Sequence, residues 1–528
     1  MGFVVDWPES NADHLIVSAK QMAELENKIL SSGLPVEALM EKVGGKMSRW
    51  FLKRGEILSE GVILLIGPGH NGGDGLVVAR ELHLSGVNVS IWCPLSLKKT
   101  LTIKQFEYAD WLGIKQLNQA PNVSGEELWI EALFGLGQTR PLPHDIADLL
   151  NEREVNKPGR LISLDVPAGI CSDKGKPLGQ IAAKASCTLT VGFYKRGLVQ
   201  DCALPFVGHL FRIDFGFPEK VLKQLIPNAP FRICAEDIST FHWPLLSPIA
   251  TKYERGRLLI IAGSDKYPGA ALLAIKGALA SGAGSIQVAL PKSISDCLWQ
   301  DAPEVVLRGV LETTSDGGAS LDRFLQEHSL DRFDSLVIGP GLGMSDEKWS
   351  QVTVALQAFS GLIIFDADAL NRISISEEGW EWLRKRKGQT VITPHLNEFK
   401  RLFKQIDFSN PIEAASEAAR LTGAGVLLKG AHSVFAAPSG LTWQIGESAP
   451  WIARTGLGDV LAGFLGGVGS IEIASKKKID WALIAVVSLI HAEAGKNCEF
   501  GSTASSIASK LSAFVRDLNQ VQCLERDT

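Results

Sequence analysis

The sequence alternates short, almost wholly apolar runs with stretches of helical periodicity over nearly its whole length. In the first half, four such runs are predicted to be buried strands: 61–67, 87–93, 128–134 and 160–167. The spacing between them leaves room for a crossover helix each time. Strands that are apolar on both faces and joined by helices are typical of a parallel sheet covered on both sides. The segment 18–52, before the first strand, is helical in pattern.

The same alternation starts again in the second half. Six further runs are predicted strands: 256–264, 284–291, 334–341, 361–368, 389–395 and 425–431. The last part, 458–515, is mostly helical by periodicity. Between the two series, the segment 217–233 has three prolines and no clear strand. We therefore predict an α/β protein with two domains, residues 1–217 and 233–528, joined by a linker at 218–232.

Composition and charge exclude several classes of protein. The 528 residues carry a net charge of −5, which argues against a broad surface for nucleic acid or anionic membrane. The longest apolar stretch, near 482–490, is shorter than the ~20 residues of a membrane helix. The N-terminus has no basic region typical of a signal peptide, and the eight cysteines are scattered without a CxxC pair. We expect a cytoplasmic enzyme with reduced thiols that binds small molecules, and neither nucleic acid nor membrane.

A glycine loop follows the first predicted strand, in LLIGPGHNGGDGLVVAR (64–80). Gly67, Gly69 and Gly72 match the dinucleotide fingerprint GxGxxG, but the next strand ends without the acid that holds a ribose. This disfavours a plain Rossmann dehydrogenase, although glycine amides at a helix start can still hold an anion. We expect Asn71 and Asp74 to be polar groups of this loop; alternatively, they only cap a helix that opens at Asp74.

Two more loops follow predicted strands. EALFGLGQTRP (131–141) is a second glycine loop, and SLDVPAGI (163–170) has Asp165 at the end of a strand before a proline turn. Ligands bind at the carboxyl ends of the strands in open parallel sheets, so the three loops predict one crevice. The alternative is that Asp165 only forms the turn.

On these residues the first half resembles the NAD(P)H-hydrate epimerase domain. The matching strings are QMAELENKILSSGLPVEALMEKVG (21–44), NGGDGLVVAR, ALFGLGQTRP, SLDVPAGI and VGFYKRGL (191–198), within about residues 15–217. The resemblance implies a modified Rossmann sheet, an N-terminal three-layer sandwich, that interconverts the R and S hydrates of NADH and NADPH. It implies that the hydrate is contacted by the following residues: His70, Asn71, Gly72, Gly73, Asp74, Gly135, Leu136, Gly137, Gln138, Thr139, Arg140, Pro141 and Asp165.

The same resemblance implies a potassium ion held by Asn71, Glu131 and the backbone at Ala168. The family usually has Asn, Asp and Ser where His70, Glu131 and Ala168 stand. Epimerisation requires the C–O bond beside the ring nitrogen to break and re-form with the help of proton transfer. A carboxylate in a partly dry pocket can be tuned for this work. We expect Asp165 to be the catalytic group, assisted by Lys195.

In the second half, ARTGLGDVLAGFL (453–465) has two glycines before Asp459 and an apolar helix after it. Backbone amides at such a helix start form a cradle for a terminal phosphate. Asp459 then stands where it can take a proton from a hydroxyl beside that phosphate. The string resembles the GxGD motif of the ribokinase-like fold; the alternative is an Asp that only caps the helix. The absence of GxxxxGK[ST] excludes a P-loop as the simplest phosphate site.

Other motifs of this half agree with a phosphate site. IAGSDKYPGAALLAIKGALASGAGS (261–285), IGPGLG (338–343) and FDADALN (365–371) place glycines and acids at strand ends, and LLKGAHSVF (427–435) places Lys429 where a cation can meet phosphates. TPHLNEF (393–399) presents His395, for which a purely structural hydrogen bond is the alternative.

Together these motifs resemble the ADP-dependent (S)-NAD(P)H-hydrate dehydratase domain, over about residues 235–520. The resemblance implies a ribokinase-like three-layer sandwich and ADP as co-substrate. Because phosphates need charge compensation, we also expect Mg²⁺, with Glu398 as a partner of the ion through water. The resemblance implies hydrate contacts at Ala270, Gly341, His395 and Asp459. It implies nucleotide contacts at Lys429, Gly430, Ala431, His432, Ser433 and Gly458. It also suggests a homo-oligomer.

The leading hypothesis is a bifunctional enzyme that repairs hydrated NADH and NADPH. The first half would epimerise the hydrates, and the second would dehydrate the S form with release of AMP and phosphate. Two alternatives stay open. The second half can be a kinase of a small vitamin-type alcohol, and the first half can be a binding module without catalysis.

Overall fold

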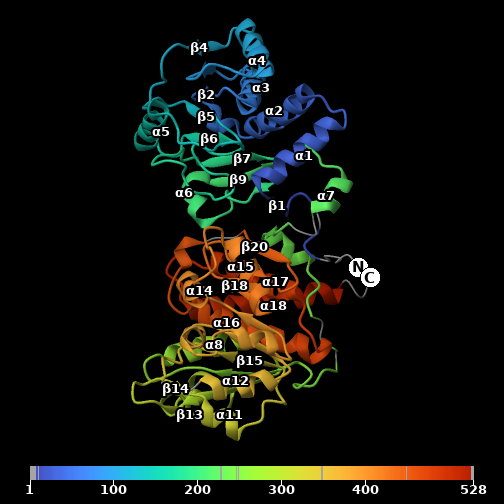
Figure 1. The fold of residues 1–528 in the computed structure, drawn as a ribbon, viewed down its shortest axis with the longest axis vertical. Helices are drawn as coiled ribbons and strands as arrows, with labels where there is room; N and C mark the ends of the chain where they lie inside the picture. Colours follow the sequence, from blue (N-terminus) through green and yellow to red (C-terminus); the bar gives the residue numbers. More distant parts are fainter. Residues whose placement is uncertain are drawn as a thin grey trace. The chain divides into compact units, whose positions relative to one another are not determined.

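The computed structural model describes residues 7–9, 11–225, 229–244, 247, 249–345, 349–446 and 449–524. The chain divides into two compact units: one comprises residues 9–230, and the other comprises residues 231–528 with a short N-terminal segment, 4–8, of which Trp7 and Pro8 are described. Figure 1 shows the first unit in blue to green and the second in green to red. The division falls inside the predicted linker, 218–232, in which α7 (Glu219–Leu225) belongs to the first unit and residues 226–228 lie outside the described residues.

The first unit is built on a seven-stranded parallel sheet with the order β4-β3-β2-β5-β6-β7-β9. Its strands are β2 (Val62–Ile66), β3 (Val89–Trp92), β4 (Lys115–Leu117), β5 (Leu128–Ala132), β6 (Leu161–Leu164), β7 (Cys187–Val191) and β9 (His209–Ile213). The chain runs outward to one side through β3 and β4 and to the other through β5, so the strand order reverses between β2 and β5. In such sheets this switch point opens a crevice at the carboxyl ends of the strands.

Helices cover both faces of this sheet, as predicted (Figure 1). They are α1 (Ala19–Ser31), α2 (Val36–Leu52), α3 (His70–Leu84), α4 (Thr100–Trp111), α5 (His144–Asn156) and α6 (Leu204–Val207). On one face α3 packs against β2, β5 and β3 and is covered by α2 and α4. On the other, Ile146 and Leu150 of α5 join a buried cluster with Ile63 and Trp129 of the sheet. A separate parallel pair joins β1 (Ile16–Val17) to β8 (Tyr194–Lys195).

The second unit is built on an eleven-stranded sheet with the order β10-β20-β19-β18-β17-β16-β15-β11-β12-β13-β14. The six predicted strands form its centre as β11 (Arg257–Ile261), β12 (Ser285–Pro291), β15 (Ser335–Ile338), β16 (Leu362–Phe365), β17 (Thr390–Ile392) and β18 (Gly425–Leu428). All neighbours within this central set are parallel, and the order reverses between β15 and β11. The flanking strands are β10 (Phe231–Ile233), β13 (Val306–Thr313), β14 (Ala319–Ser320), β19 (Val434–Ala436) and β20 (Thr442–Ile445).

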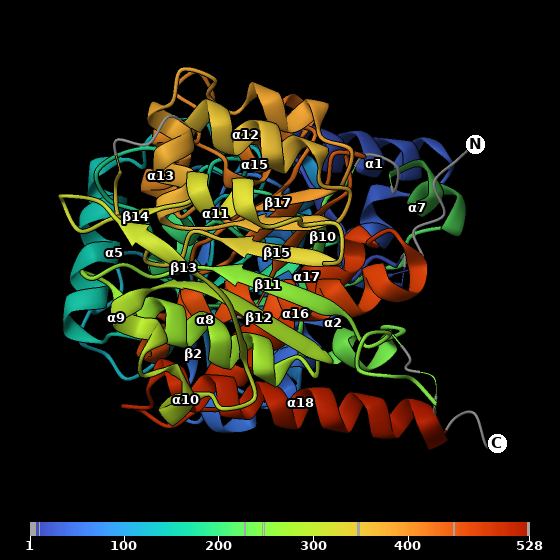
Figure 2. The same cartoon turned by 90° about the horizontal axis from the view of Figure 1, so that it is seen from below.

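Figure 2 shows the helices of this unit in two layers, with α11, α12, α13 and α15 on one face of the sheet and α8 and α16 on the other. The helices of the first layer are α11 (Asp322–Glu327), α12 (Trp349–Ala358), α13 (Asp368–Ile375), α14 (Leu396–Leu402) and α15 (Pro411–Thr422). The second layer contains α8 (Pro268–Ala280), α16 (Leu457–Lys476), α17 (Trp481–Lys496) and α18 (Ala504–Leu524). Two short helices follow β12: α9 (Lys292–Ser295) and α10 (Leu298–Asp301).

Close packing of α8 against α16 depends on glycine. A Cβ on Gly463 would lie 1.8 Å from the carbonyl oxygen of Ala274, and a Cβ on Gly277 would lie 2.0 Å from that of Val460. The backbones of the two helices therefore touch. Helix α16 is long and apolar enough to cross a membrane by length and composition, but most of it is buried inside this unit, as in the core helix of a globular domain.

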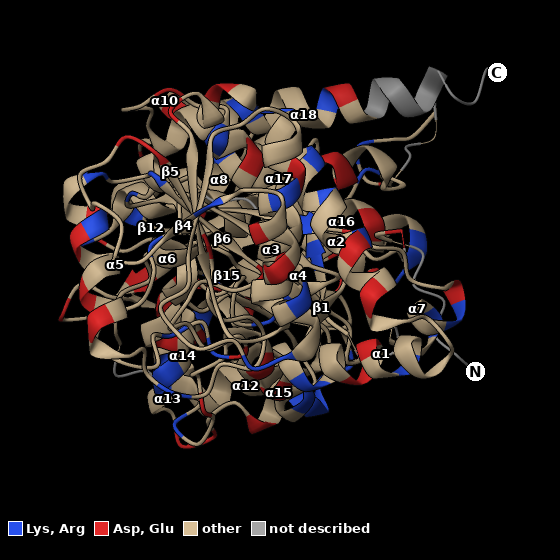
Figure 3. Cartoon of the chain, turned by 90° about the horizontal axis from the view of Figure 1, so that it is seen from above, with Lys and Arg blue, Asp and Glu red and all other residues tan. Residues whose placement is uncertain are grey.

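Charged residues of both signs are interspersed along α1, α2 and α5 (Figure 3). Seven of the eight cysteines are described as free thiols, and Cys523 lies where side chains are not described.

Candidate functional sites

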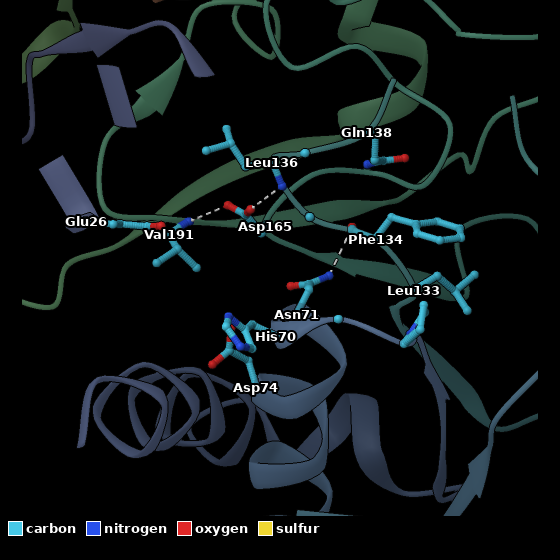
Figure 4. Close-up of a pocket in the computed structure, with 14 residues that line it drawn as sticks. Glu26, His70, Asn71, Asp74, Leu133, Phe134, Leu136, Gln138, Asp165 and Val191 are labelled. Atoms are coloured by element: carbon cyan, nitrogen blue, oxygen red, sulfur yellow. Dashed lines mark hydrogen bonds between the residues drawn. The ribbon is translucent and has the colours of Figure 1, made fainter. Parts of the chain in front are cut away.

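A cavity of about 370 Å³ lies at the switch point of the first unit (Figure 4). Its walls come from the segments that follow β2 and β5 and from Asp165 after β6. The chain approaches itself closely here: a Cβ on Gly67 would lie 1.7 Å from the carbonyl oxygen of Leu133. The three loops that the sequence placed in one crevice therefore do converge.

The cavity brings together most of the predicted hydrate contacts. Those that line it are His70, Asn71, Asp74, Gly135, Leu136, Gly137, Gln138 and Asp165. Gly72 and Gly73, Thr139, Arg140 and Pro141 are not among the lining residues. The two glycines allow close packing instead, since a Cβ on Gly72 would meet the carbonyl oxygen of Gly67 at 2.1 Å.

The helix of the glycine loop begins earlier than expected. Helix α3 starts at His70, with Gly69 at its N-cap, so the alternative that Asn71 and Asp74 only cap a helix opening at Asp74 was wrong. Asn71 and Asp74 lie in its first turns instead of in the loop. The reason is that the glycines 72 and 73 are accommodated inside the helix, where α2 and the start of the loop press against them. Both polar side chains still line the cavity.

Asp165 has a strained backbone conformation, and both of its carboxylate oxygens accept hydrogen bonds. Its φ is +67°, in the left-handed region that favours glycine. One carboxylate oxygen accepts hydrogen bonds from Lys195 Nζ at 2.6 Å and from the amide of Val191 at 3.2 Å, and the other accepts from the amide of Leu136 at 3.1 Å. Lys195 is only 1% exposed and also donates to Thr190 Oγ1 at 3.0 Å. Strained non-glycine residues of this kind cluster at functional sites.

Glu26 of α1 also lines the cavity, although the sequence analysis did not assign it. Burial raises the pKa of Glu26 to about 7; the nearby charge of Asp165 raises it further and that of Lys195 opposes the rise. A signal was present in the sequence: Glu26 lies four residues after Met22, on the face of α1 that is buried. An acid at such a position requires either a partner or a function.

Asp74, in α3, faces the same groups. Burial raises its pKa well above the usual range, and the charges of Asp165 and Glu26 add to the rise. His70, at the start of α3, has a lowered pKa because of burial and the nearby charge of Lys99. Three carboxyl groups and one ammonium group therefore interact around this cavity.

Two of the three predicted potassium ligands accept hydrogen bonds from backbone amides. Glu131 is fully buried, and its two carboxyl oxygens accept hydrogen bonds from the amides of Ala168 at 2.9 Å and Leu133 at 3.2 Å. The carbonyl oxygen of Ala168 accepts from the amide of Ala183 at 2.8 Å. Among the oxygens of these three predicted ligands, Oδ1 of Asn71 is the one that is buried without a hydrogen-bond partner among the described residues. Burial raises the pKa of Glu131 to about 7. The two hydrogen bonds of its carboxyl group join the segment after β5 to the segment after β6.

In the second unit, the start of α16 lies against a lysine and an aspartate. Gly456 is the N-cap of α16 with φ +91°, and its amide-rich turn continues through Gly458. A Cβ on Gly458 would lie 3.3 Å from Lys429 Nζ and 3.7 Å from Asp366 Oδ2. A bare helix start beside an ammonium group suits a phosphate. Lys429 and Gly458, both predicted nucleotide contacts, are thus neighbours.

Asp459 lies in the first turn of α16. Burial raises its pKa to about 7; the charges of Asp366 and Asp368 add to the rise and that of Lys429 opposes it. Lys429 donates to Asp366 at 2.6 Å, and Thr393 Oγ1 donates to the same carboxylate oxygen at 2.7 Å. Asp366 and Asp368 belong to the motif FDADALN at the end of β16, for which no catalytic or binding role was predicted. As the immediate partner of Lys429, Asp366 belongs to the site.

His395 caps α14. Its Nδ1 accepts a hydrogen bond from the amide of Asn397 at 3.0 Å, and a carboxylate oxygen of Glu398 accepts one from the amide of His395 at 2.8 Å. Its Nε2 lies 3.3 Å from Glu398 Oε1. His395 therefore does make the structural hydrogen bonds that were the alternative to ligand binding. Its side chain is still 49% exposed, so it can also contact a ligand. Burial raises the pKa of Glu398 to about 7, against the lowering effect of Lys429.

Ala270 and Gly341, two predicted hydrate contacts, pack against each other. Gly341 has φ +65°, and a Cβ there would lie 2.7 Å from Cβ of Ala270. The same loop reaches the acidic cluster, since the amide of Gly343 donates to Asp368 at 2.9 Å. The remaining predicted nucleotide contacts, Gly430, Ala431, His432 and Ser433, form the turn between β18 and β19 directly after Lys429.

Each unit thus places acid–base groups at the carboxyl ends of parallel strands, and the second adds an uncapped helix start beside a lysine. This defines a two-site α/β enzyme. A family model for NAD(P)H-hydrate dehydratases matches residues 258–515, and one described as the YjeF-related protein N-terminus matches residues 36–197.

The relatives span almost the whole chain. The bifunctional NAD(P)H-hydrate repair enzyme Nnr of Synechocystis sp. is 39% identical over 484 residues, which are 91% of this chain and 90% of the relative. The enzyme of that name from Gloeobacter violaceus is 38% identical, over 86% of this chain and 88% of its own. The chain belongs to the family of bifunctional NAD(P)H-hydrate repair enzymes.

Solved structures resemble one part of the chain. A ribokinase-like superfamily protein from Enterococcus faecalis has a TM-score of 0.46 at 22% identity, covering 55% of this chain and 96% of its own. An ADP/ATP-dependent NAD(P)H-hydrate dehydratase from Bacillus subtilis, co-crystallised with ATP/Mg²⁺, has a TM-score of 0.44 at 23% identity, covering 54% of this chain and 96% of its own.

Proposed function

We propose that this chain repairs hydrated NADH and NADPH with both of its units. The first unit interconverts the R and S hydrates, and the second dehydrates the S hydrate in an ADP-dependent reaction. The observation that carries this proposal is the 39% identity to a bifunctional repair enzyme along 91% of the chain, because it includes both sites and their order. The acid–base groups at the strand ends of both units support it.

In the second unit, Asp459 acts as the general base. A carboxylate with a pKa of about 7 is matched to proton transfer at neutral pH. It takes the proton of the ring hydroxyl, whose oxygen attacks the terminal phosphorus of ADP, and AMP leaves. The ring nitrogen then expels phosphate, and loss of a proton from the neighbouring carbon restores the dihydronicotinamide. Phosphate is the better leaving group, which explains a kinase-like site in a dehydratase.

The surrounding groups hold the phosphates. Lys429 supplies positive charge beside the amides at the start of α16, and Asp366 fixes its position through the 2.6 Å ion pair. Magnesium ordinarily takes one or two carboxylates together with substrate phosphates. The described residues contain no preformed cluster of three side chains for a metal. Glu398 would hold the ion through water beside the nucleotide phosphates, and the ion would neutralise phosphate charge.

In the first unit, Asp165 is the catalytic carboxylate, and Lys195 compensates its charge across 2.6 Å. The hydrate binds in the cavity at the switch point. The potassium ion stays a prediction of the family resemblance, and no step is assigned to it because two of its three predicted ligands are bonded to amides. A homo-oligomer in the cytoplasm and the domain limits 1–217 and 233–528 are further proposals of the resemblance and the sequence.

The test uses the full chain. Incubation with ADP and hydrated NADH is expected to restore the absorbance of the reduced nicotinamide and to release AMP and phosphate. Separately, the R hydrate without ADP is expected to convert to the S hydrate faster than it does spontaneously. A stable phosphorylated vitamin-type alcohol in place of the first result would indicate the kinase. An unaccelerated R hydrate would make the first unit a binding module.

A further inference from the structure

The cavity of the first unit holds more acid–base groups than Asp165 and Lys195 alone. Glu26 comes from α1, Asp74 and His70 come from α3, and Asp165 follows β6 (Figure 4). All four side chains line the same cavity. An enzyme that breaks and re-forms a C–O bond needs a proton donor as well as a negative charge. The structure offers several carboxyl groups for these two tasks.

The environments of Asp165 and Glu26 differ sharply. Both oxygens of Asp165 already accept hydrogen bonds, from Lys195, Val191 and Leu136. No hydrogen bond from a described residue reaches the carboxyl group of Glu26, which is half-buried near the charge of Asp165. Paired carboxyl groups in contrasting surroundings divide the roles of acid and anion between them.

The other titratable groups around Glu26 are less suited to move a proton. Burial, together with the charges of Asp165 and Glu26, raises the pKa of Asp74 well above its usual range, and a carboxyl group that holds its proton so firmly gives it up less readily. Burial and the charge of Lys99 lower the pKa of His70, which disfavours the protonated imidazole that an acid requires. Lys195 lowers the pKa of Glu26 and so opposes the effect of Asp165. Its ammonium group donates hydrogen bonds to Asp165 and Thr190. Glu26 is the remaining carboxyl group.

We propose that Glu26 is the catalytic acid of the first unit, protonating the hydroxyl group as it leaves the hydrate and recovering the proton when water returns. This inference rests on the proposed epimerase function. The proton of the Glu26 carboxyl moves to the hydroxyl oxygen, the C–O bond breaks, and water departs. The lone pair of the ring nitrogen forms a C=N⁺ bond, whose positive charge faces the Asp165 carboxylate. Water adds to either face of that carbon, and its extra proton returns to Glu26.

The experiment compares Glu26→Gln with Glu24→Gln in the full chain. Glu24 lies on the same helix and pairs only loosely with Lys20, at 3.9 Å, with 58% of its side chain exposed. Conversion of R hydrate to S hydrate is followed without ADP, with the spontaneous rate subtracted. We expect Glu26→Gln to lose about 10²- to 10⁴-fold in kcat, as is typical for loss of a general acid. Glu24→Gln should keep the rate of the unaltered protein.

The pH profile distinguishes catalysis from structural damage. The cycle begins with protonated Glu26, so the rate of the unaltered protein should decline as pH rises through about 7. Glu26→Gln should lose this decline, and Glu26→Asp should restore it at an intermediate rate. A Glu26→Gln protein that keeps the full rate, or loses rate but keeps the decline, overturns the proposal.

Failure of the epimerase function itself gives a different result. Each preparation is also assayed for ADP-dependent dehydration of the S hydrate. If the unaltered protein dehydrates the S hydrate but does not accelerate the R-to-S conversion, the first unit is not an epimerase. If it does accelerate the conversion, the comparison of the variants tests Glu26 alone.

Discussion

Two adjacent glycines of α2, Gly44 and Gly45, should respond in opposite directions to alanine. A Cβ on Gly44 would lie 2.5 Å from Cγ1 and 2.6 Å from Cβ of Val77 in α3, and 3.3 Å from the carbonyl oxygen of Asp74. Favourable carbon–carbon contacts lie at about 3.5–4.0 Å, so α2 and α3 would have to separate. A Cβ on Gly45 would meet no atom within 4 Å.

The magnitudes follow from these contacts. Overpacking costs about 1–3 kcal/mol, and replacing glycine by alanine inside a helix returns about 0.5–1 kcal/mol. Gly44→Ala should therefore destabilise the α2–α3 contact by about 1–2 kcal/mol, and Gly45→Ala should stabilise α2 by about 0.5–1 kcal/mol. Because α3 carries Asn71 and Asp74, Gly44→Ala should also slow the R-to-S conversion, while Gly45→Ala should not.

Hydrogen exchange of α2 and α3 amides in the full chain measures the free energy of local opening without requiring the two units to unfold together. The expected result is faster exchange in Gly44→Ala and unchanged or slower exchange in Gly45→Ala. Equal effects of the two substitutions, or no change in Gly44→Ala, would refute the packing argument.

Two further predictions concern the chemistry. Dehydration of the S hydrate should accelerate as pH rises through about 7, because Asp459 must lose its proton to act as a base; a pH-independent kcat/KM between pH 6 and 8 would contradict this role. Replacing potassium by a large organic cation should slow the R-to-S conversion, because Asn71 Oδ1 has no partner among the described residues and the oxygens of Glu131 and Ala168 each keep a free lone pair beside their amide bond. A rate that the replacement leaves unchanged would contradict the predicted potassium site.

The sequence predicted most of the central strands that are buried on both faces, but it missed β7, β19 and β20, which are also buried at every position. Strands β2 and β16 are apolar at every position, and β5 is apolar except at Glu131; each was placed correctly to within a few residues. Strand β13 was missed because most of its side chains are exposed or half-exposed at the edge of the sheet. Strand β9 was missed for the same reason: of its five residues only Ile213 is buried. An apolar run cannot reveal a strand that faces solvent.

The site residues divide into those that a local motif indicates and those that only the fold brings to the site. Asp165 and Asp459 stand beside glycine or proline turns at strand and helix ends, so local sequence pointed to both. Glu26 lies in the middle of a helix, and only the fold brings it to the cavity. The sequence also did not predict the hydrogen bonds of Glu131 to two amides. Glu131 is one methylene group longer than the Asp usual at this position, and the sequence alone does not show which atoms its carboxylate reaches.

The central claim is that Asp459 activates the hydrate for ADP-dependent repair, and Asp459→Asn in the full chain tests it most directly. With ADP and the S hydrate, the return of reduced-nicotinamide absorbance should fall by about 10²- to 10⁴-fold. The R-to-S conversion by the same preparation should be unchanged, because it belongs to the other unit. Dehydration at the normal rate by Asp459→Asn would contradict the account.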